Sequence, residues 1–382
     1  MCVPIYFGCN IPEAVVPIAS IQGEPLRDTA GFCRGCRVHT IRDVARLAGA
    51  SPATASKVLN NSGSVSAKLT QRVLNAVRAL DYHPDNLARS LKTRKSQTLG
   101  ILIPDVTNPF YTDVIKGVEN EARAQGYSLV LCDSSEDPRL EQTNLDMLFA
   151  RRVDGILLAP TGNYVSLERF THRSCPLVLF DRFPPGYAGA AVVTDSFGGA
   201  YDATRHLLSL GHERIAIVTG RLVLPNAQER LDGFRQALQE AHLPLRSEYL
   251  CPGTFQSESG YECGLKLMRL GEPPSAIFSC NNKMTLGLMR ALYELYVACP
   301  ERVSVVGFDD FDWAANFSPR LTTVAQPALE MGRQAVLMLL AQIGSGKGAA
   351  GADQNQKVIL KAEVRVRDST APPYSASRNI SK

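Results

Sequence analysis

The chain of 382 residues is too long for one ordinary hydrophobic core, because single domains mostly hold about 100–200 residues. Its hydrophobic fraction of 45% and charged fraction of 20% are typical of a globular protein. No apolar run reaches the roughly 18 residues that a membrane span needs, so we expect a cytoplasmic protein with no membrane partner.

An apolar stretch near the start, IPEAVVPIAS, is interrupted by Pro12, Glu13 and Pro17 and follows no basic region. A secretory signal is therefore not expected. We predict residues 1–38 to be a disordered N-terminal extension. The alternative is that they are not translated and that synthesis begins at a non-AUG codon for Val38.

The ten cysteines indicate reduced thiols rather than a disulfide framework. Six are scattered singly through a long chain: Cys132, Cys175, Cys251, Cys263, Cys280 and Cys299. The other four are Cys2, Cys9 and the CxxC pair Cys33 and Cys36, which could complete a four-thiolate zinc site. A single CxxC is weak evidence, so we predict neither a metal nor a cofactor.

Positive charge is concentrated in residues 39–97, which hold ten Lys or Arg against three Asp. Since the whole chain carries only +4, the remainder is mildly acidic. A basic module attached to a mildly acidic remainder is typical of a nucleic-acid-binding protein with a separate sensing domain.

The first part of this module predicts two short helices. Thr40 and Asp43 form a capping pattern, and Gly49 ends the first helix after the apolar positions Ile41, Val44, Ala45 and Ala48. Ser51 caps a second helix with Pro52 at its first position. Two helices across a tight turn form a helix-turn-helix, whose second helix enters the DNA major groove.

A third helix follows and closes a helix-turn-helix domain over residues 39–83. Ser66 is its predicted cap, and its apolar positions are Leu69, Val73, Ala76, Val77 and Leu80. Residues 84–97 are a predicted hinge helix and linker. The hinge allows only about two helical turns, so we expect it to fold only on DNA.

The segments TIRDVARLAGASPATASKVLN, VSAKLTQRVLNAVRALDYHPDNLARSLKT, VVGFDD and LTTVAQP resemble the LacI/GalR family of repressors. The resemblance runs from about His39 to about Asp368. It implies a sequence-specific DNA-binding transcription regulator, not an enzyme, that acts as a homodimer on double-stranded operator DNA and responds to a small effector.

By this resemblance, Pro52, Ala53 and Lys57 fall on base-contacting positions in the major groove. Leu91 falls on a leucine that wedges into the minor groove, where an apolar side chain unstacks and kinks DNA. The family usually has Arg at the position of Lys57, and this departure leaves the operator sequence open. The predicted DNA-contacting residues are Thr40, Ser51, Pro52, Ala53, Thr54, Ser56, Lys57, Asn60, Asn86, Arg89 and Leu91. The alternatives are ordinary helix surface for Thr54 and Ser56, and packing on the large domain for Leu91.

From Thr98, short apolar runs alternate with amphipathic stretches, which predicts an α/β domain with parallel sheets. The predicted strands are 98–104, 128–132, 155–159, 176–180, 191–193, 215–218, 276–279 and 303–306. By the resemblance this effector-binding and dimerisation domain, residues 98–368, is two-lobed like a periplasmic sugar-binding protein. The first lobe holds about 98–194 and 328–353, and the second about 195–325 and 354–368. Residues 369–382 are a predicted flexible tail.

Parallel sheets bind ligands beyond the carboxyl ends of their strands. The residues that follow the predicted strands there, which the resemblance also places on effector-contacting positions, are Phe110, Tyr111, Asp181, Arg230, Phe255, Asn281, Asp309 and Gln326. Such aromatic and bidentate polar groups suit a polyhydroxylated or carboxylated compound. Asp309 as a helix cap, and Phe110 and Phe255 as core residues, are the alternatives. Asn282 stands where the family commonly has Asp and is interpreted as structural.

No catalytic residues are predicted. The segment from Gly344 to Gly348 is similar to a phosphate loop but lacks its Ser or Thr, and the His212-Glu213 pair has no second His in helical register. A transport receptor and an enzyme with a DNA-binding appendage are the rival classes. Among effectors, a sugar, a sugar acid and a phosphorylated sugar stay open, with a purine less favoured; release and promotion of DNA binding stay open as well. The C-terminal tail lacks apolar heptads, so a dimer is expected.

Overall fold

The computed structural model describes residues 39–60, 62–82, 95–162, 175–316, 318–345 and 356–374. The chain divides into two compact units, residues 1–85 and residues 86–382. Each unit is described by itself. Asn86, Arg89 and Leu91 of the predicted hinge, and the four cysteines Cys2, Cys9, Cys33 and Cys36, lie outside the described residues.

The described residues of the first unit form three helices, α1 (Ile41–Ala48), α2 (Pro52–Leu59) and α3 (Ala67–Ala79). Their apolar faces form one small core, in which Val44, Ala55 and Val73 are fully buried. The predicted helix-turn-helix is therefore confirmed, together with the apolar faces that define it.

The predicted ends of the first two helices are confirmed at the level of single bonds. Thr40 donates its N–H and its hydroxyl to the Asp43 carboxylate at 3.0 and 2.8 Å, and the Ser51 Oγ accepts the Thr54 N–H at 3.1 Å. Gly49 ends α1 at φ +58°, in the left-handed region that glycine tolerates. Ser66 precedes α3 as predicted, but its side chain makes no capping hydrogen bond.

The first lobe of the large unit is a six-stranded sheet of order β11-β5-β4-β3-β1-β2. Its strands are β1 (Thr98–Ile103), β2 (Ser128–Asp133), β3 (Gly155–Leu158), β4 (Leu177–Phe180), β5 (Ala191–Thr194) and β11 (Lys357–Leu360). Its helices are α5 (Pro109–Ala124), α6 (Pro138–Ala150) and α12 (Ala328–Ser345).

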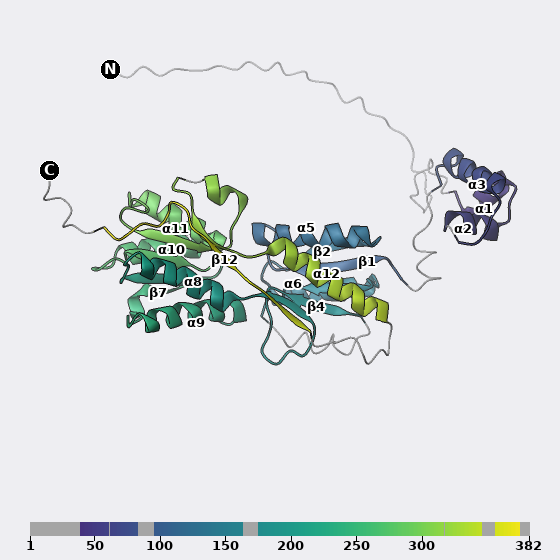
Figure 1. Cartoon of the computed structure of the whole chain (residues 1–382). Coiled ribbons are helices and arrows are strands. Elements are labelled where there is room, and N and C mark those ends of the chain that lie inside the picture. Colours follow the sequence, from purple (N-terminus) through teal and green to yellow (C-terminus); the bar gives the residue numbers. More distant parts are fainter. Residues whose placement is uncertain are drawn as a thin grey trace, which may run out of the picture. The chain divides into compact units, whose positions relative to one another are not determined.

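Successive side chains of a strand point to opposite faces of the sheet, and both faces of this sheet are apolar. Leu99 and Ile101 join the core beneath α5 and α12, whereas Leu102 joins the core beneath α6 (Figure 1). Gly117 of α5 and Gly332 of α12 allow these two helices to approach closely. A Cβ at either position would lie 2.1 Å from a backbone carbonyl oxygen of the other helix.

The second lobe repeats the arrangement, with sheet order β12-β10-β9-β8-β6-β7. Its strands are β6 (Ile215–Thr219), β7 (Leu250–Pro252), β8 (Ala276–Ser279), β9 (Ser304–Phe308), β10 (Thr322–Ala325) and β12 (Glu363–Arg365). Its helices are α8 (Ser196–Ser209), α9 (Pro225–Glu240), α10 (Ser257–Met268) and α11 (Asn282–Glu294), with short 3-10 turns η1 (Ser247–Tyr249) and η2 (Asp312–Asn316). Figure 1 shows α8 and α9 on one face of this sheet and α10 and α11 on the other.

The strand pairings correct one predicted boundary between the lobes. Residues 354–368 were assigned to the second lobe, but β11 pairs in parallel with β5 of the first lobe. Only β12 joins the second lobe, antiparallel to β10. The chain crosses between the lobes after β5, after β10 and again after β11, so the third crossing follows Leu360. The exposed alternate positions of this short edge strand give a weak hydrophobic signal in the sequence.

The predicted flexible tail also begins too early. Ser369 is fully buried and bonds β9 through the Val305 N–H and carbonyl groups, and Ala371 accepts a hydrogen bond from His212 at 2.9 Å. Residues 369–371 are therefore held on the second lobe by polar contacts that hydrophobic periodicity does not predict.

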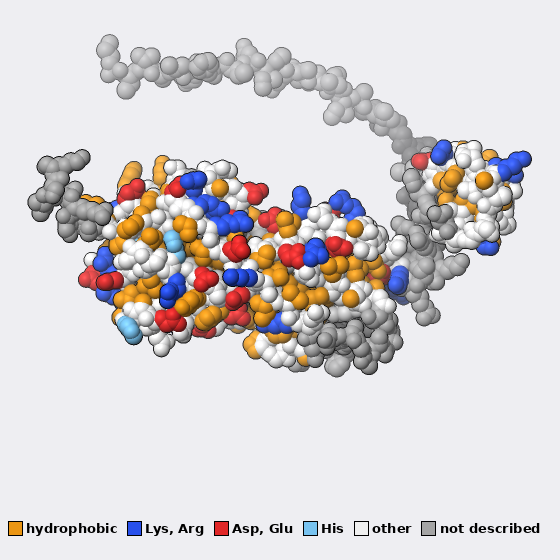
Figure 2. Space-filling view, in the orientation of Figure 1, with side chains coloured by type: hydrophobic (Ala, Val, Ile, Leu, Met, Phe, Trp, Pro, Cys, Tyr) orange, Lys and Arg blue, Asp and Glu red, His pale blue; other side chains and the backbone are white. Residues whose placement is uncertain are grey.

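Within the described ranges, no helix is long and apolar enough to cross a membrane. The face shown in Figure 2 mixes apolar, acidic and basic side chains on both lobes, without one dominant charge. Gly344 and Ser345 are the last residues of α12 rather than part of a loop after a strand.

Candidate functional site

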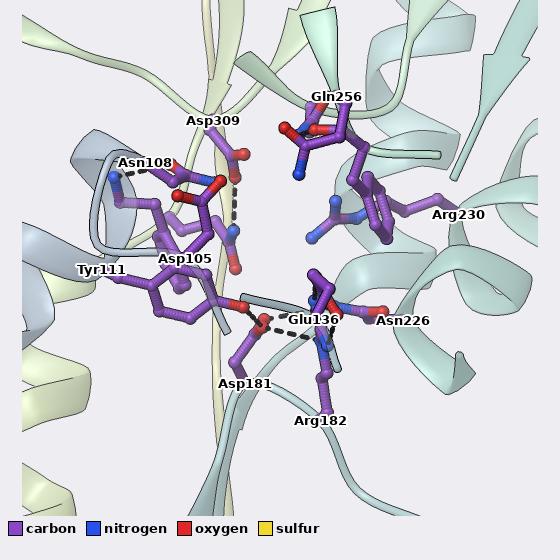
Figure 3. A pocket seen from close by; sticks show the side chains of 14 residues that line it. Asp105, Asn108, Tyr111, Glu136, Asp181, Arg182, Asn226, Arg230, Gln256 and Asp309 are labelled. Carbon is purple, nitrogen blue, oxygen red and sulfur yellow. Dashed lines mark hydrogen bonds and ion pairs between the residues drawn. The ribbon is translucent and has the colours of Figure 1, made fainter. Parts of the chain in front are cut away.

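A pocket between the two lobes is lined by all eight residues predicted to contact an effector. With the solvent at its mouth included, it has a volume of about 370 Å³. Figure 3 shows Tyr111 and Asp181 on one side of the pocket and Arg230 and Asp309 on other sides, pointing toward a shared space. The structure therefore brings together the residues that were predicted from their positions after strands. Their role in ligand binding stays a prediction.

Asp181 follows β4 and supplies the first carboxylate of the pocket. It is 7% exposed and adopts φ +63°. The Tyr111 hydroxyl donates to its Oδ2 at 2.7 Å, and Asn226 of the second lobe donates to its Oδ1 at 3.2 Å. Burial, with the neighbouring Asp181, holds the pKa of the Tyr111 hydroxyl well above 10, so this hydroxyl stays a donor at neutral pH.

Asp309 follows β9 and supplies the second carboxylate. Its Oδ1 accepts from Gln326 Nε2 at 2.5 Å, and its Oδ2 accepts from the Asn282 N–H at 3.4 Å. Burial raises the pKa of Asp309, while the positive charge of Arg230 acts in the opposite direction. The bond to the first residue of α11 means that Asp309 also stabilises a helix start, so the capping alternative holds in part.

Arg230 lies on α9 with only 3% of its surface exposed. Its Nη1 donates to the Cys280 carbonyl at 2.6 Å, and its guanidinium lies 3.7 Å from the centre of the Phe308 ring. The aromatic face and the carbonyl together fix the plane of the guanidinium, and a fixed planar donor suits bidentate recognition.

The predicted aromatic and amide residues combine structural and lining positions. Phe110 belongs to the core of the first lobe and Phe255 to that of the second, and both also line the pocket. Asn281 caps α11 by accepting the Met284 N–H and donates to the Phe255 carbonyl, each at 2.9 Å. Its side chain is therefore largely committed to the fold.

Sequence reasoning missed six lining residues: Asp105, Asn108, Glu136, Arg182, Asn226 and Gln256. Asp105, Glu136 and Arg182 lie two or three residues after the ends of β1, β2 and β4, so the strand-end rule could have identified them. Arg182 donates to both Glu136 oxygens, at 3.0 and 2.6 Å.

Polar contacts join the two lobes around the pocket. Lys283 of α11 forms an ion pair with Asp105 at 2.7 Å, and Asn282 donates to Asn108 at 2.8 Å. Burial alone would raise the pKa of Asp105, but hydrogen bonds from Lys283 and Thr107 lower it overall. On another side, Arg221 of the second lobe donates to Glu136 of the first. These contacts hold the lobes closed over the pocket.

Four buried polar atoms on lining residues have no hydrogen-bond partner within the described part of the chain. They are Arg182 Nε, Asn226 Oδ1, Arg230 Nε and Gln326 Oε1. Buried polar atoms in native proteins usually have a partner, since leaving one without costs about 1–3 kcal/mol. A ligand that offers both donors and acceptors would satisfy them.

The second candidate site is the exposed face of α2. Ala55 is fully buried against the core, whereas Pro52, Ala53, Lys57 and the C-cap Asn60 are exposed. Asn60 Nδ2 donates to the Ser56 carbonyl and hydroxyl oxygens at 2.9 and 3.2 Å, and Thr54 and Ser51 share a hydroxyl hydrogen bond of 2.9 Å. The three residues predicted to contact bases, Pro52, Ala53 and Lys57, thus lie on the solvent-facing side of the helix.

Residues 40–85 match the bacterial regulatory proteins of the lacI family, and residues 204–370 match a periplasmic binding protein-like domain. The chain is 37% identical to the HTH-type transcriptional repressor PurR of Haemophilus influenzae (strain PittGG) over 334 residues, 86% of this chain and 98% of that protein. A lac repressor dimer bound to operator and the anti-inducer ONPF is 25% identical, with a TM-score of 0.78 over 88% of this chain and 100% of the other. A regulator of Enterococcus faecium with bound ribose is 30% identical, with a TM-score of 0.65 over 72% of this chain and 100% of the other.

Proposed function

The chain belongs to the lacI family of bacterial regulatory proteins, and we infer that an effector bound between its lobes changes the affinity of its helix-turn-helix for an operator. It is a DNA-binding transcription repressor with an effector-binding domain, and its family is not enzymatic. The observation that carries the proposal is the convergence of strand-end side chains from both lobes on one pocket.

We propose a neutral polyhydroxylated compound, a sugar, as the effector. Arg182 is already paired with Glu136, and Lys283 with Asp105. Asp181 also pairs with Arg182, whose Nε lies 3.5 Å from its Oδ2, and Glu136 pairs with Arg221 as well. The lining charges left to a ligand are therefore one carboxylate, Asp309, and one cation, Arg230. A sugar acid or sugar phosphate would place a second negative charge beside Asp309, with the single guanidinium of Arg230 to balance both, whereas sugar hydroxyls can donate to the carboxylates and accept from Arg230.

For DNA binding we propose a homodimer on a palindromic operator, with α2 of each protomer in the major groove. Lys57 is the candidate for hydrogen bonding to a base edge, because Pro52 and Ala53 offer only apolar contacts. The solved lac repressor dimer on its operator supports this arrangement. Effector binding must favour one arrangement of the lobes over another, since a ligand that binds both equally shifts neither.

A thermal-shift screen of the full chain tests the effector. D-Ribose and other neutral pentoses and hexoses are compared with the matching sugar acids, sugar phosphates and purine bases. A ligand of the native cleft stabilises by mass action, by about 2.7 kcal/mol at a concentration 100 times its Kd. We expect neutral sugars to give the largest rise in Tm. A purine or a sugar phosphate that outperforms every neutral sugar would overturn the proposed effector class.

A further inference from the structure

Asp181 and Asp309, two of the four residues whose carboxylates line the pocket, sit on backbone in the left-handed region. Asp181 has φ +63° and Asp309 has φ +72°. They follow β4 and β9, which hold the same place in the two sheets, two strands from the edge formed by β11 or β12. A side chain with a Cβ disfavours this conformation because the Cβ crowds the carbonyl oxygen, so the surroundings must enforce it.

In each lobe the next residue is held by a two-pronged pair between Arg and a carboxylate. Arg182 donates through both Nη atoms to Glu136. In the second lobe the charges are reversed, because Asp310 is the carboxylate and accepts from Nη1 and Nη2 of Arg367, both at 2.9 Å. In both lobes, the residue after the left-handed Asp therefore forms a two-pronged pair between a guanidinium and a carboxylate, although the residues differ.

Arg367 also fixes the neighbouring strand β10. Its Nη1 donates to the Leu321 carbonyl at 2.6 Å and to the Thr323 hydroxyl at 3.0 Å. The Thr323 hydroxyl in turn donates to Asp310 at 2.7 Å. β10 leads directly to Gln326, the hydrogen-bonding partner of Asp309. The Arg367 guanidinium therefore holds the backbone next to Asp309 and the strand that ends before Gln326.

We propose that Arg367, which does not line the pocket, is a positioning residue for effector recognition. By holding Asp310 and β10, it keeps Asp309 in its left-handed conformation with the carboxylate on Gln326. Arg367 lies just beyond β12, so the end of the third crossing is tied to the ligand-facing carboxylate. This inference rests on the proposed function of the pocket.

Arg365 provides a matched control two residues away. It also donates to Asp310, at 2.5 Å, but through Nη1 alone, and its side chain is 57% exposed against 16% for Arg367. An exposed, single-pronged pair contributes little to holding a backbone in place. Arg365→Leu removes one positive charge beside the Asp310 carboxylate, as Arg367→Leu does, but it leaves the two-pronged pair between Arg367 and Asp310 intact.

The first experiment needs no effector. Hydrogen–deuterium exchange of the full chain is compared for the parent, Arg367→Leu and Arg365→Leu. We expect faster exchange in the segment 309–316 of Arg367→Leu, with the first-lobe strands unchanged, and no change in Arg365→Leu. Unchanged exchange in 309–316 of Arg367→Leu would overturn the proposal. If Arg367→Leu fails to fold, Arg367→Lys, which keeps the charge and loses the fork, takes its place with the same expectation.

The second experiment is a double-mutant cycle on D-ribose affinity, measured by calorimetry with Asp309→Asn as the other change. Arg367→Leu should raise the Kd by roughly 5- to 30-fold, the change that corresponds to about 1–2 kcal/mol of left-handed backbone strain. In Asp309→Asn it should raise the Kd no further, because Arg367 acts through Asp309. Equal losses in both backgrounds would make Arg367 merely structural. If the parent binds neither D-ribose nor any other neutral sugar of the screen, the proposed effector class fails, and the exchange experiment still decides the role of Arg367.

Discussion

Replacement of Arg230 by Ala should abolish most of the effector affinity. The guanidinium is held by the Cys280 carbonyl at 2.6 Å and by the Phe308 ring, so it meets a ligand without reorganising. A hydrogen bond to a charged group contributes about 1.5–3 kcal/mol, which corresponds to a Kd raised roughly 10- to 150-fold. Operator affinity without effector should be unchanged, because the pocket lies in a different unit from α2.

The assay is calorimetric titration with the neutral sugar that gives the largest thermal shift, performed well below the Tm of each variant. Arg235→Ala is the matched control, since Arg235 lies on the same helix with its side chain 47% exposed and pairs only with Asp232 among the contacts described for it. It should bind the sugar with the parent Kd. An unchanged Kd in Arg230→Ala would refute the placement of the effector in this pocket. All eight predicted effector contacts would then be wrong.

Three further changes test other parts of the molecule. Lys57→Ala should relax discrimination at one operator base pair by about 1–3 kcal/mol, measured by anisotropy on single-substitution operators; a uniform loss would make Lys57 a phosphate contact. Lys283→Met and Asp105→Asn should each weaken sugar binding, and their effects should not add, because both open the same contact between the lobes. Burial lowers the pKa of His212 below 6.5, so the stability that its neutral ring contributes should be lost as the pH falls below about 6.5; His212→Gln should flatten the profile of Tm against pH, and an unchanged slope would contradict this.

The sign of the His212 effect follows from its contacts. Its ring is buried and bonds Ser275, Ser304 and the Ala371 carbonyl, and the two ring nitrogens lie within 2.9–3.1 Å of these oxygens. A neutral ring can donate from one nitrogen and accept at the other, whereas a protonated ring cannot accept. Because the pKa of His212 is lower in the folded than in the unfolded protein, its contribution to the free energy of unfolding is present at pH values above the unfolded pKa. That contribution is lost as the pH falls below it.

The sequence predicted best where one signal dominated. Long apolar strands such as β1, β6 and β9 are buried along nearly all of their length, and the capping pattern of Thr40 and Asp43 reproduces the observed bonds. Most of the eight pocket residues followed from a geometric rule about strand ends, although Arg230 lies within α9, and the resemblance gave the same eight positions.

Short edge strands and polar partnerships were not predictable in this way. β7 and β12 have only three residues each, and β11 alternates between exposed and half-buried positions, so none of them forms a clear apolar run. The pair of Arg367 with Asp310 joins residues 57 apart in the chain, and no local pattern signals it. Whether a charged residue faces a ligand or another side chain depends on such distant partners.

Operator binding measured with and without effector tests the central claim most directly. An operator duplex is first selected in vitro from a random library with the full chain, and its affinity is then measured by anisotropy as neutral sugar is added. The account predicts that saturating sugar changes operator affinity, with release of the DNA as the expected direction. It also predicts that Arg230→Ala binds the same duplex but no longer responds to the sugar at that concentration. An operator affinity that stays the same at saturating sugar, in a parent chain shown by calorimetry to bind that sugar, would contradict it.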